Sequence, residues 1–292
     1  CFVNMIEEGD RVLVIQNGYF GLRMENMCQR LGSNLSLLKF DWGKSVDVAK
    51  VEDHLKKNKY DVVAVVHAET STGVKNCIED ISACIDEETI FIVDAVTSLG
   101  TVDVQVDNWG IDAIYSCSQK GLSCPPGASP ISFSEKALNK MKRRKKIAPN
   151  WYLDMSEIIK YWDGQQRVYH HTAPINMMYA LYQSLYDLLE EGLDNTIQRH
   201  YEAHLLLKKG LNDLGLELLV DKESRLPSLN AVKIPNDVDD VEVRSKLLND
   251  YSIEIGGGLG PFAGNVWRIG LMGYSAKPKN ISILIDALRE IL

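Results

Sequence analysis

The sequence has few cysteines, no long hydrophobic run and no excess of basic residues, and each shortage excludes a class of protein. Six cysteines among 292 residues are too few for a disulfide scaffold, and none forms a Cys-x-x-Cys pair, so we expect a reducing compartment and no zinc ribbon. The apolar runs fall short of the roughly 20 residues that a membrane helix needs. Lys and Arg number 32 against 40 Asp and Glu, a formal net charge of −8 that argues against a nucleic-acid partner. We therefore expect neither a membrane nor a nucleic-acid binder.

What the chain does have is a regular alternation of apolar runs and mixed, charged stretches. Nearly continuous apolar runs occur at 11–16, 61–66, 89–93 and 111–115. Such runs are typical of strands buried on both faces. The stretches between them have helix length and lie at 20–32, 46–58 and 74–86. This order predicts an α/β fold with a mostly parallel sheet covered by helices.

The second half of the chain has a different pattern. A long helical pattern spans about 174–214, and shorter strand and helix patterns follow it, ending in a final helix near 277–291. This change predicts two domains, a large one over 1–191 and a smaller α+β domain over 192–292.

Polar side chains follow the apolar runs at the points where a ligand binds in an open parallel sheet, the carboxyl ends of the strands. Asp94 comes directly after one run, and Lys120 lies just beyond the next. A buried structural ion pair is one interpretation of this pair. The other is a pyridoxal phosphate site, where a lysine amine forms a Schiff base and an aspartate holds the pyridine nitrogen protonated. Nearby hydroxyl and amide groups, together with an aromatic ring at Phe20, favour the second interpretation.

Several motifs, in order along the chain, carry a family resemblance. They are HAETSTG (67–73), VDAVTSLG (93–100), SCSQKGLSCPPG (116–127), YHHT (169–172), GGLGP (257–261) and RIGLMG (268–273). As a set they resemble the class V aminotransferases, most closely the alanine–glyoxylate and serine–pyruvate group. The resemblance covers essentially the whole chain and implies the fold type I architecture of pyridoxal-phosphate-dependent transferases.

The resemblance implies roles for the residues around the cofactor ring. Lys120 would carry the Schiff base and move the proton between the substrate α-carbon and the cofactor. Asp94 would bind the pyridine nitrogen, and Val96 would pack on one ring face. Phe20, at a position where the family commonly has Trp, would stack on the opposite face.

The resemblance also implies which residues bind the other cofactor groups and the substrate. Thr70, where the family usually has Ser, would serve cofactor oxygens, and Gln119 would reach the phosphate. Tyr169 and Thr172 would reach the phosphate of a neighbouring subunit, which makes the active site a property of a homodimer. Arg268 would clamp the substrate carboxylate with its planar fork.

These roles imply an enzyme that transfers an amino group from alanine or serine to glyoxylate or pyruvate, with pyridoxal 5′-phosphate as cofactor and no metal. Three alternatives stay open: a kynurenine or 3-hydroxykynurenine transaminase of the same family, a cysteine desulfurase-like lyase, and a catalytically impaired truncated chain. The desulfurase chemistry usually places His before the lysine, whereas Gln119 stands there in this chain.

The two ends of the chain lack features that the family pattern includes. Family members carry a Ser-Gly-His-type turn, which holds the cofactor phosphate, just before the segment that matches residues 1–10. The chain begins at Cys1 rather than Met, and we therefore interpret it as a fragment cut inside a helix. The chain also ends at Leu292, short of the tail where peroxisomal members keep a targeting tripeptide. We expect an intracellular location, peroxisomal or cytoplasmic with mitochondrial possible, and the sequence does not choose among these compartments.

Overall fold

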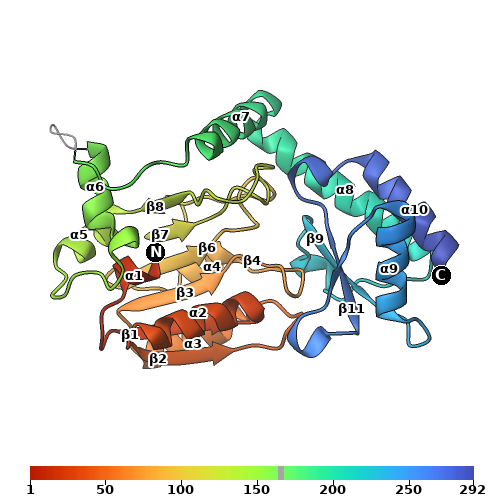
Figure 1. Ribbon diagram of the computed structural model, residues 1–292. Helices are drawn as coiled ribbons and strands as arrows, with labels where there is room; N and C mark the ends of the chain where they lie inside the picture. Colours follow the sequence, from red (N-terminus) through yellow and green to blue (C-terminus); the bar gives the residue numbers. More distant parts are fainter. Residues whose placement is uncertain (164–167) are drawn as a thin grey trace.

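The computed structural model describes residues 1–163 and 168–292, and its larger part is a twisted six-stranded sheet with helices on both faces (Figure 1). The strand order is β2-β1-β3-β6-β7-β8. The strands are β1 (Arg11–Gln16), β2 (Asn34–Lys39), β3 (Val62–Val66), β6 (Ile90–Asp94), β7 (Ala113–Tyr115) and β8 (Ile131–Phe133). All pairings are parallel except that of β7 with β8. The predicted α/β class with a mostly parallel sheet is confirmed.

The central strands form where the sequence is continuously apolar. Every residue of β3 and of β6 is buried, because helices cover both faces of the sheet. One face packs against α1 (Phe2–Met5), α2 (Tyr19–Arg30), α5 (Glu135–Lys142) and α6 (Met155–Asp163). The other face packs against α3 (Val48–Lys57) and α4 (Ile78–Ser82). The predicted helical stretch 74–86 is shorter than expected, since its start forms β5 (Val74–Lys75), which pairs with β4 (Ala68–Glu69).

A smaller α+β unit follows. Its sheet has the antiparallel order β10-β11-β9, made of β9 (Leu229–Lys233), β10 (Gly256–Gly257) and β11 (Val266–Gly270). Three helices pack on it around the fully buried Trp267: α8 (Leu193–Asp213), α9 (Asp240–Tyr251) and α10 (Pro278–Ile291). Short 3-10 turns occur at Trp151–Leu153, Lys222–Ser224, Gly260–Phe262 and Gly273–Ser275.

The long helical pattern at 174–214 is two helices rather than one. α7 (Ile175–Glu191) ends and α8 begins on either side of Gly192, whose φ of 88° lies in the left-handed region that glycine tolerates best. α7 extends from the large sheet to the smaller unit (Figure 1). Glu191 and Arg199 form a two-point ion pair across this junction, at 2.5 and 2.9 Å.

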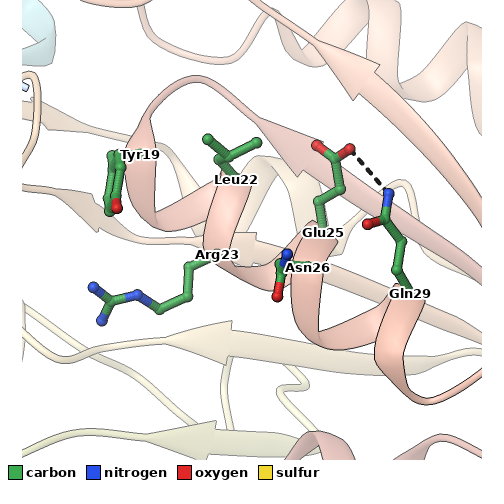
Figure 2. A pocket seen from close by; sticks show the side chains of 6 residues that line it. All are labelled: Tyr19, Leu22, Arg23, Glu25, Asn26 and Gln29. Carbon is green, nitrogen blue, oxygen red and sulfur yellow. Dashed lines mark hydrogen bonds between the residues drawn. The ribbon is translucent and has the colours of Figure 1, made fainter. Parts of the chain in front are cut away.

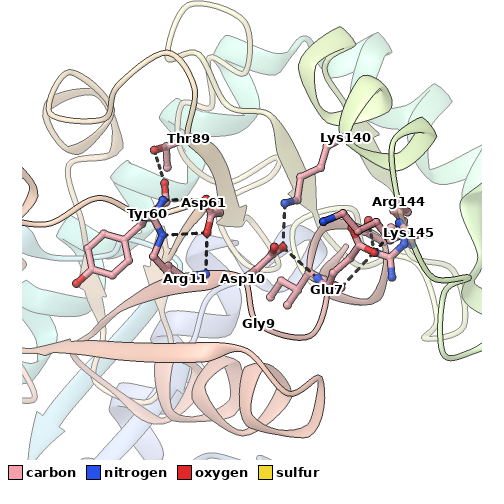
Figure 3. Close-up of polar contacts among 12 residues, drawn as sticks. Glu7, Gly9, Asp10, Arg11, Tyr60, Asp61, Thr89, Lys140, Arg144 and Lys145 are labelled. Atoms are coloured by element: carbon pink, nitrogen blue, oxygen red, sulfur yellow. Dashed lines mark hydrogen bonds and ion pairs between the residues drawn. The ribbon is translucent and has the colours of Figure 1, made fainter.

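The first residues of the chain are tied to α5 and to the basic run that follows it, residues 143–146 (Figure 3). Arg144 donates to the carbonyl oxygens of Asn4 and Ile6 at 2.9 and 3.1 Å, and Lys140 pairs with Asp10 at 2.8 Å. The side chain of Glu7 accepts two backbone N–H groups of the basic run. These contacts fix the segment around α1 against the sheet. Among the described residues, no helix is both long and apolar enough to cross a membrane.

The carboxyl ends of the parallel strands face the smaller unit (Figure 1). The contacts that join the units at this edge include an ion pair of Lys44 with Asp221 at 2.7 Å and a hydrogen bond from Arg268 of β11 to the carbonyl oxygen of Thr70 at 3.3 Å. Polar residues that follow the strands are thereby held between the two units.

Candidate active site

Asp94 is the last residue of β6 and is almost completely buried, with 7% of its surface exposed. Burial raises its pKa to about 6, because a charged carboxylate loses its hydration there. Hydrogen bonds from the Val96 N–H, at 2.8 Å to Oδ1, and from the Tyr115 hydroxyl act in the opposite direction, as does the charge of Arg23. Asp94 is thus a buried acid that a further cation would stabilise.

Lys120 lies in a turn beyond β7, the strand next to Asp94 in the sheet, and is half-buried. The Ser123 N–H donates to its carbonyl oxygen at 3.0 Å and closes the turn. Within residues 1–163 and 168–292, its amine makes no hydrogen bond and no ion pair, with Asp94 or any other residue. The structural ion pair considered from the sequence is therefore not formed, and the Lys120 amine is available for chemistry.

The turn is held tightly at Gly121. A Cβ atom at this position would overlap the carbonyl oxygen of Leu99 and lie 2.7 Å from a methyl carbon of Thr101. The turn therefore packs directly on the backbone that follows Asp94 and Val96. This contact keeps the segment carrying the lysine next to the segment carrying the acid.

Glu69 lies within the HAETSTG motif, but the sequence alone assigned it no role. Its buried carboxylate accepts from the N–H groups of Phe20 and Gly21, at 3.1 and 3.2 Å, and from the hydroxyl and N–H of Ser71, at 2.6 and 3.2 Å. Burial raises its pKa, and the nearby charge of Asp94 adds to the increase. The carboxylate caps the positive end of α2 and so fixes the backbone of Phe20 at the edge of the sheet. The close approach depends on Gly18, where a Cβ would overlap the Glu69 side chain.

Phe20 is half-buried near the start of α2, with a cation over its ring. The guanidinium of Arg23 lies 4.9 Å from the Phe20 ring centroid and 5.9 Å from that of Tyr19. Arg23 is one of the α2 residues that line a pocket of about 390 Å³, and Figure 2 shows its side chain extending toward the end of α2 that carries Tyr19. Because Arg23 also lowers the pKa of Asp94, the Phe20 ring and the buried acid belong to one neighbourhood.

Arg268 reaches this edge from β11 of the smaller unit. Its Nε donates to the Gly257 carbonyl oxygen at 2.7 Å and its Nη1 to the Thr70 carbonyl oxygen at 3.3 Å. Burial lowers the pKa of Arg268, while the charge of Glu69 opposes the decrease. The structure therefore brings Thr70 and Arg268 together, as parts of one polar edge with Glu69 and Asp94.

Three predicted residues lie apart from this cluster or point to solvent. Gln119 is exposed, directly before Lys120. Tyr169 and Thr172 are exposed in the segment between α6 and α7 (Figure 1), and their hydroxyls are hydrogen-bonded to each other at 2.8 Å. The described contacts of these two hydroxyls do not reach Asp94 or Lys120, so a single chain does not bring them to the cluster.

Two buried polar atoms at the same sheet edge have no hydrogen-bond partner within the described ranges. They are His67 Nδ1, after β3, and Ser98 Oγ, four residues after Asp94. Unpaired buried polar atoms are costly in a folded chain, and a bound ligand is one way to satisfy them. The edge thus offers a buried acid, an unpaired amine, a guanidinium and unsatisfied polar atoms, which suits a ligand with both a basic nitrogen and acidic groups.

The family model Aminotransferase class-V matches residues 1–273. The alanine–glyoxylate aminotransferase of Mus musculus is 39% identical over 293 residues, which are 99% of this chain and 71% of the relative. The (S)-ureidoglycine–glyoxylate transaminase of Bacillus subtilis (strain 168) is 36% identical over 308 residues, 99% of this chain and 74% of the relative. The crystal structure of an alanine–glyoxylate aminotransferase from Nostoc sp. superposes with a TM-score of 0.96 at 46% identity, covering 99% of this chain and 77% of that one.

Proposed function

The chain belongs to the class V aminotransferase family, and we propose that it transfers an amino group from alanine or serine to glyoxylate or pyruvate with pyridoxal 5′-phosphate as cofactor. The observation that carries this proposal is that Asp94, Lys120 and Arg268 lie at one sheet edge. Asp94 is buried, Lys120 has no ion-pair or hydrogen-bond partner for its amine among the described residues, and Arg268 is half-buried. An aspartate can pair with a protonated pyridine nitrogen, a lysine amine can react with an aldehyde, and an arginine can bind a substrate carboxylate.

The residues present fit the cofactor. A protonated pyridine nitrogen would bring a cation to the buried Asp94, whose pKa is about 6 although the charge of Arg23 lowers it. Lys120 is free to bind the aldehyde, and Phe20 and Val96 are the residues we assign to the two faces of the ring. The hydroxyl of Thr70 and the amide of Gln119 are assigned to cofactor oxygens and phosphate.

When bound, the cofactor supplies an electron sink that lowers the cost of removing a proton from the α-carbon of an amino acid. Arg268 binds the substrate carboxylate with its two-pronged guanidinium and so orients the α-carbon. Lys120 Nζ would take the proton from the α-carbon of the substrate and deliver it to the cofactor. Asp94 holds the ring nitrogen protonated, and its burial strengthens this charge interaction because water is excluded.

The names of the relatives support glyoxylate as the amino acceptor, since it is common to the mouse, Nostoc and Bacillus proteins. A pyridoxamine–pyruvate aminotransferase from Mesorhizobium loti, 26% identical with a TM-score of 0.93, supports pyruvate as a related acceptor. Transfer to glyoxylate gives glycine.

A peroxisomal or cytoplasmic location fits a chain whose six cysteines are all free.

The experiment that tests this proposal measures glycine formed from alanine and glyoxylate by the purified chain with added pyridoxal phosphate, together with the absorption of the bound cofactor. We expect turnover and a visible absorption band, and we expect Lys120→Ala to lose both. Lys209→Ala, which removes an exposed lysine on α8, is the matched control and should behave as the parent. If Lys120→Ala is as active as Lys209→Ala, the proposal is wrong.

We further propose that two chains form a homodimer in which Tyr169 and Thr172 contact the cofactor phosphate of the partner. The support is an exposed apolar surface on and beside α7, where Tyr169, Tyr179, Tyr182 and Leu189 are 69–74% exposed. Aromatic residues are enriched in interfaces, and such exposure is costly in an isolated chain.

Subunit complementation tests this arrangement. One chain carries Lys120→Ala, and the other carries Tyr169→Phe together with Thr172→Val; each is weakly active alone. When the two chains are unfolded and refolded together, activity should return. A mixed dimer has one site in which Lys120 of one chain and Tyr169 and Thr172 of the other are all intact. Mixing Lys120→Ala with Lys120→Ala/Tyr169→Phe is the control and should regain nothing. No gain in the first mixture would contradict a shared site.

A further inference from the structure

Within the part of the chain that the structure describes, a hydrogen bond links the turn that carries Lys120 to the smaller unit. The Tyr274 N–H, in the loop that follows β11, donates to Ser123 Oγ at 2.8 Å. Ser123 closes the Lys120 turn through its own N–H, at 3.0 Å from the Lys120 carbonyl oxygen. Its φ of 58° is in the left-handed region, which costs free energy for a serine. A residue held in this conformation by contacts on both sides is a candidate for positioning.

The loop that meets Ser123 is itself fixed to α8 by two consecutive residues. His200 is fully buried; its Nδ1–H donates to the Thr196 carbonyl oxygen at 2.7 Å and its Nε2 accepts the Gly273 N–H at 2.9 Å. Since one ring nitrogen faces an acceptor and the other a donor, the ring is neutral and has a single tautomer. Arg199 donates to the carbonyl oxygens of Gly273 and Ala276 at 2.8 and 3.2 Å.

The loop and the turn are in close contact at Gly273. At Gly273, whose φ is 54°, a Cβ would overlap Ser123 Oγ and lie 3.2 Å from the Gly121 carbonyl oxygen. On its other side the turn is held by α7, where the Ser184 hydroxyl donates to the Leu122 carbonyl oxygen. The turn is therefore enclosed by hydrogen bonds from both units.

We propose that Ser123 is a positioning residue, which together with Gly273 and His200 fixes the Lys120 turn relative to the strand that carries Arg268. This inference rests on the proposed function, because its consequence is the alignment of the proton-moving amine with a substrate held by Arg268. β11 ends at Gly270, only a few residues before Gly273, so the same loop restrains both groups. Loss of the link misaligns the amine and slows proton transfer, while the carboxylate site stays intact.

Two variants and one control distinguish the effect of the Ser123 side-chain oxygen from the effect of its positive φ. Ser123→Ala removes the acceptor. Ser123→Asn keeps a side-chain oxygen, and asparagine is a residue type that tolerates a positive φ. Ser252→Ala is the matched control, because Ser252 is also an exposed serine with a φ of 56° but lies at the end of α9.

Amide hydrogen exchange and lysine labelling on the cofactor-free chain test the link without any turnover. We expect Ser123→Ala to increase exchange at Tyr274 and acetylation of Lys120 Nζ by acetic anhydride about fivefold, equivalent to the loss of one hydrogen bond. Ser123→Asn and Ser252→Ala should match the parent. Equal rates in Ser123→Ala and Ser252→Ala would overturn the inference, even in a chain that showed no aminotransferase activity.

Steady-state kinetics of the cofactor-loaded protein then test the consequence. We expect Ser123→Ala to lower kcat about fivefold with the KM of the amino donor within about twofold of the parent, and Ser123→Asn to restore kcat. An unchanged kcat in Ser123→Ala, despite faster exchange, would refute the positioning role. An inactive parent with the expected exchange pattern would instead count against the proposed function alone.

Discussion

Asp94→Asn should make the cofactor-free chain more stable while removing its function. The carboxyl has a pKa of about 6 in the folded chain against 3.8 for an ordinary aspartate. Because the pKa is raised, Asp94 favours folding below pH 3.8 and loses that advantage as the pH rises through about 6. At about 1.4 kcal/mol per pKa unit, the loss amounts to about 3 kcal/mol at pH 8 and about 1.6 kcal/mol at pH 5. The asparagine carries no such penalty and still offers an oxygen to the Val96 N–H.

Thermal unfolding of the cofactor-free variants at pH 5 and pH 8 measures this difference. We expect Asp94→Asn to unfold on the order of 6–12 °C above the parent at pH 8, and about half as far above it at pH 5. Asp237→Asn, at an exposed loop position, is the matched control and should show no pH-dependent gain. An Asp94→Asn variant no more stable than the parent at pH 8, or one with equal gains at both pH values, would refute the reasoning.

Added cofactor should reverse the order of stability. The protonated pyridine nitrogen pairs with Asp94 in the parent and finds no charge in the variant, so the parent gains more from binding. We expect pyridoxal phosphate to raise the unfolding temperature of the parent and to raise that of Asp94→Asn much less. Equal increases would show that Asp94 does not hold the cofactor.

Three further substitutions test the other parts of the edge. Arg268→Lys keeps the charge but loses the planar fork, so the KM of the amino donor should rise at least about tenfold in initial-rate assays, and an unchanged KM would contradict carboxylate binding by Arg268. Glu69→Ala removes the acceptor of the Phe20, Gly21 and Ser71 groups and leaves a cavity, so the free energy of unfolding measured by thermal unfolding should fall by about 2–4 kcal/mol; a variant as stable as the parent would contradict the capping of α2. Gly121→Ala forces a Cβ onto the Leu99 backbone and should cost about 1–3 kcal/mol, whereas Gly270→Ala, with its nearest atom 3.8 Å away, is the control; equal effects would contradict the close packing of the Lys120 turn.

The sequence predicted the central strands well because burial on both faces leaves an unbroken apolar run. The runs at 11–16, 61–66, 89–93 and 111–115 correspond to β1, β3, β6 and β7. β2 was missed, since it is an edge strand whose residues are only partly buried. The helical pattern at 174–214 did not show the break at Gly192, because residues on both sides of it favour a helix. The division at 191/192 into two domains stays a prediction.

The site was predictable where chemistry follows a strand end, and less so where it depends on contacts between distant segments. Asp94 stands directly after one apolar run and Lys120 a few residues beyond the next, and the strands that precede them are neighbours in the sheet, so both lie at one edge. Glu69 gave no such pattern, because its partners are backbone N–H groups of α2, which begins 50 residues earlier. The link from His200 through Gly273 to Ser123 joins three distant segments and is visible only in the folded chain.

The two buried carboxylates of the edge differ in how far the chain satisfies them, and this difference assigns their roles. Glu69 accepts four hydrogen bonds from α2 and Ser71, enough to hold it in place without any ligand. Asp94 accepts from the Val96 N–H and the Tyr115 hydroxyl, and neither donor carries a charge. With two neutral donors against four, the charge of Asp94 is stabilised less than that of Glu69, and a nearby cation would add to its stabilisation. Glu69 is thus suited to maintain the geometry of the edge, and Asp94 to bind a cation that comes from outside the chain.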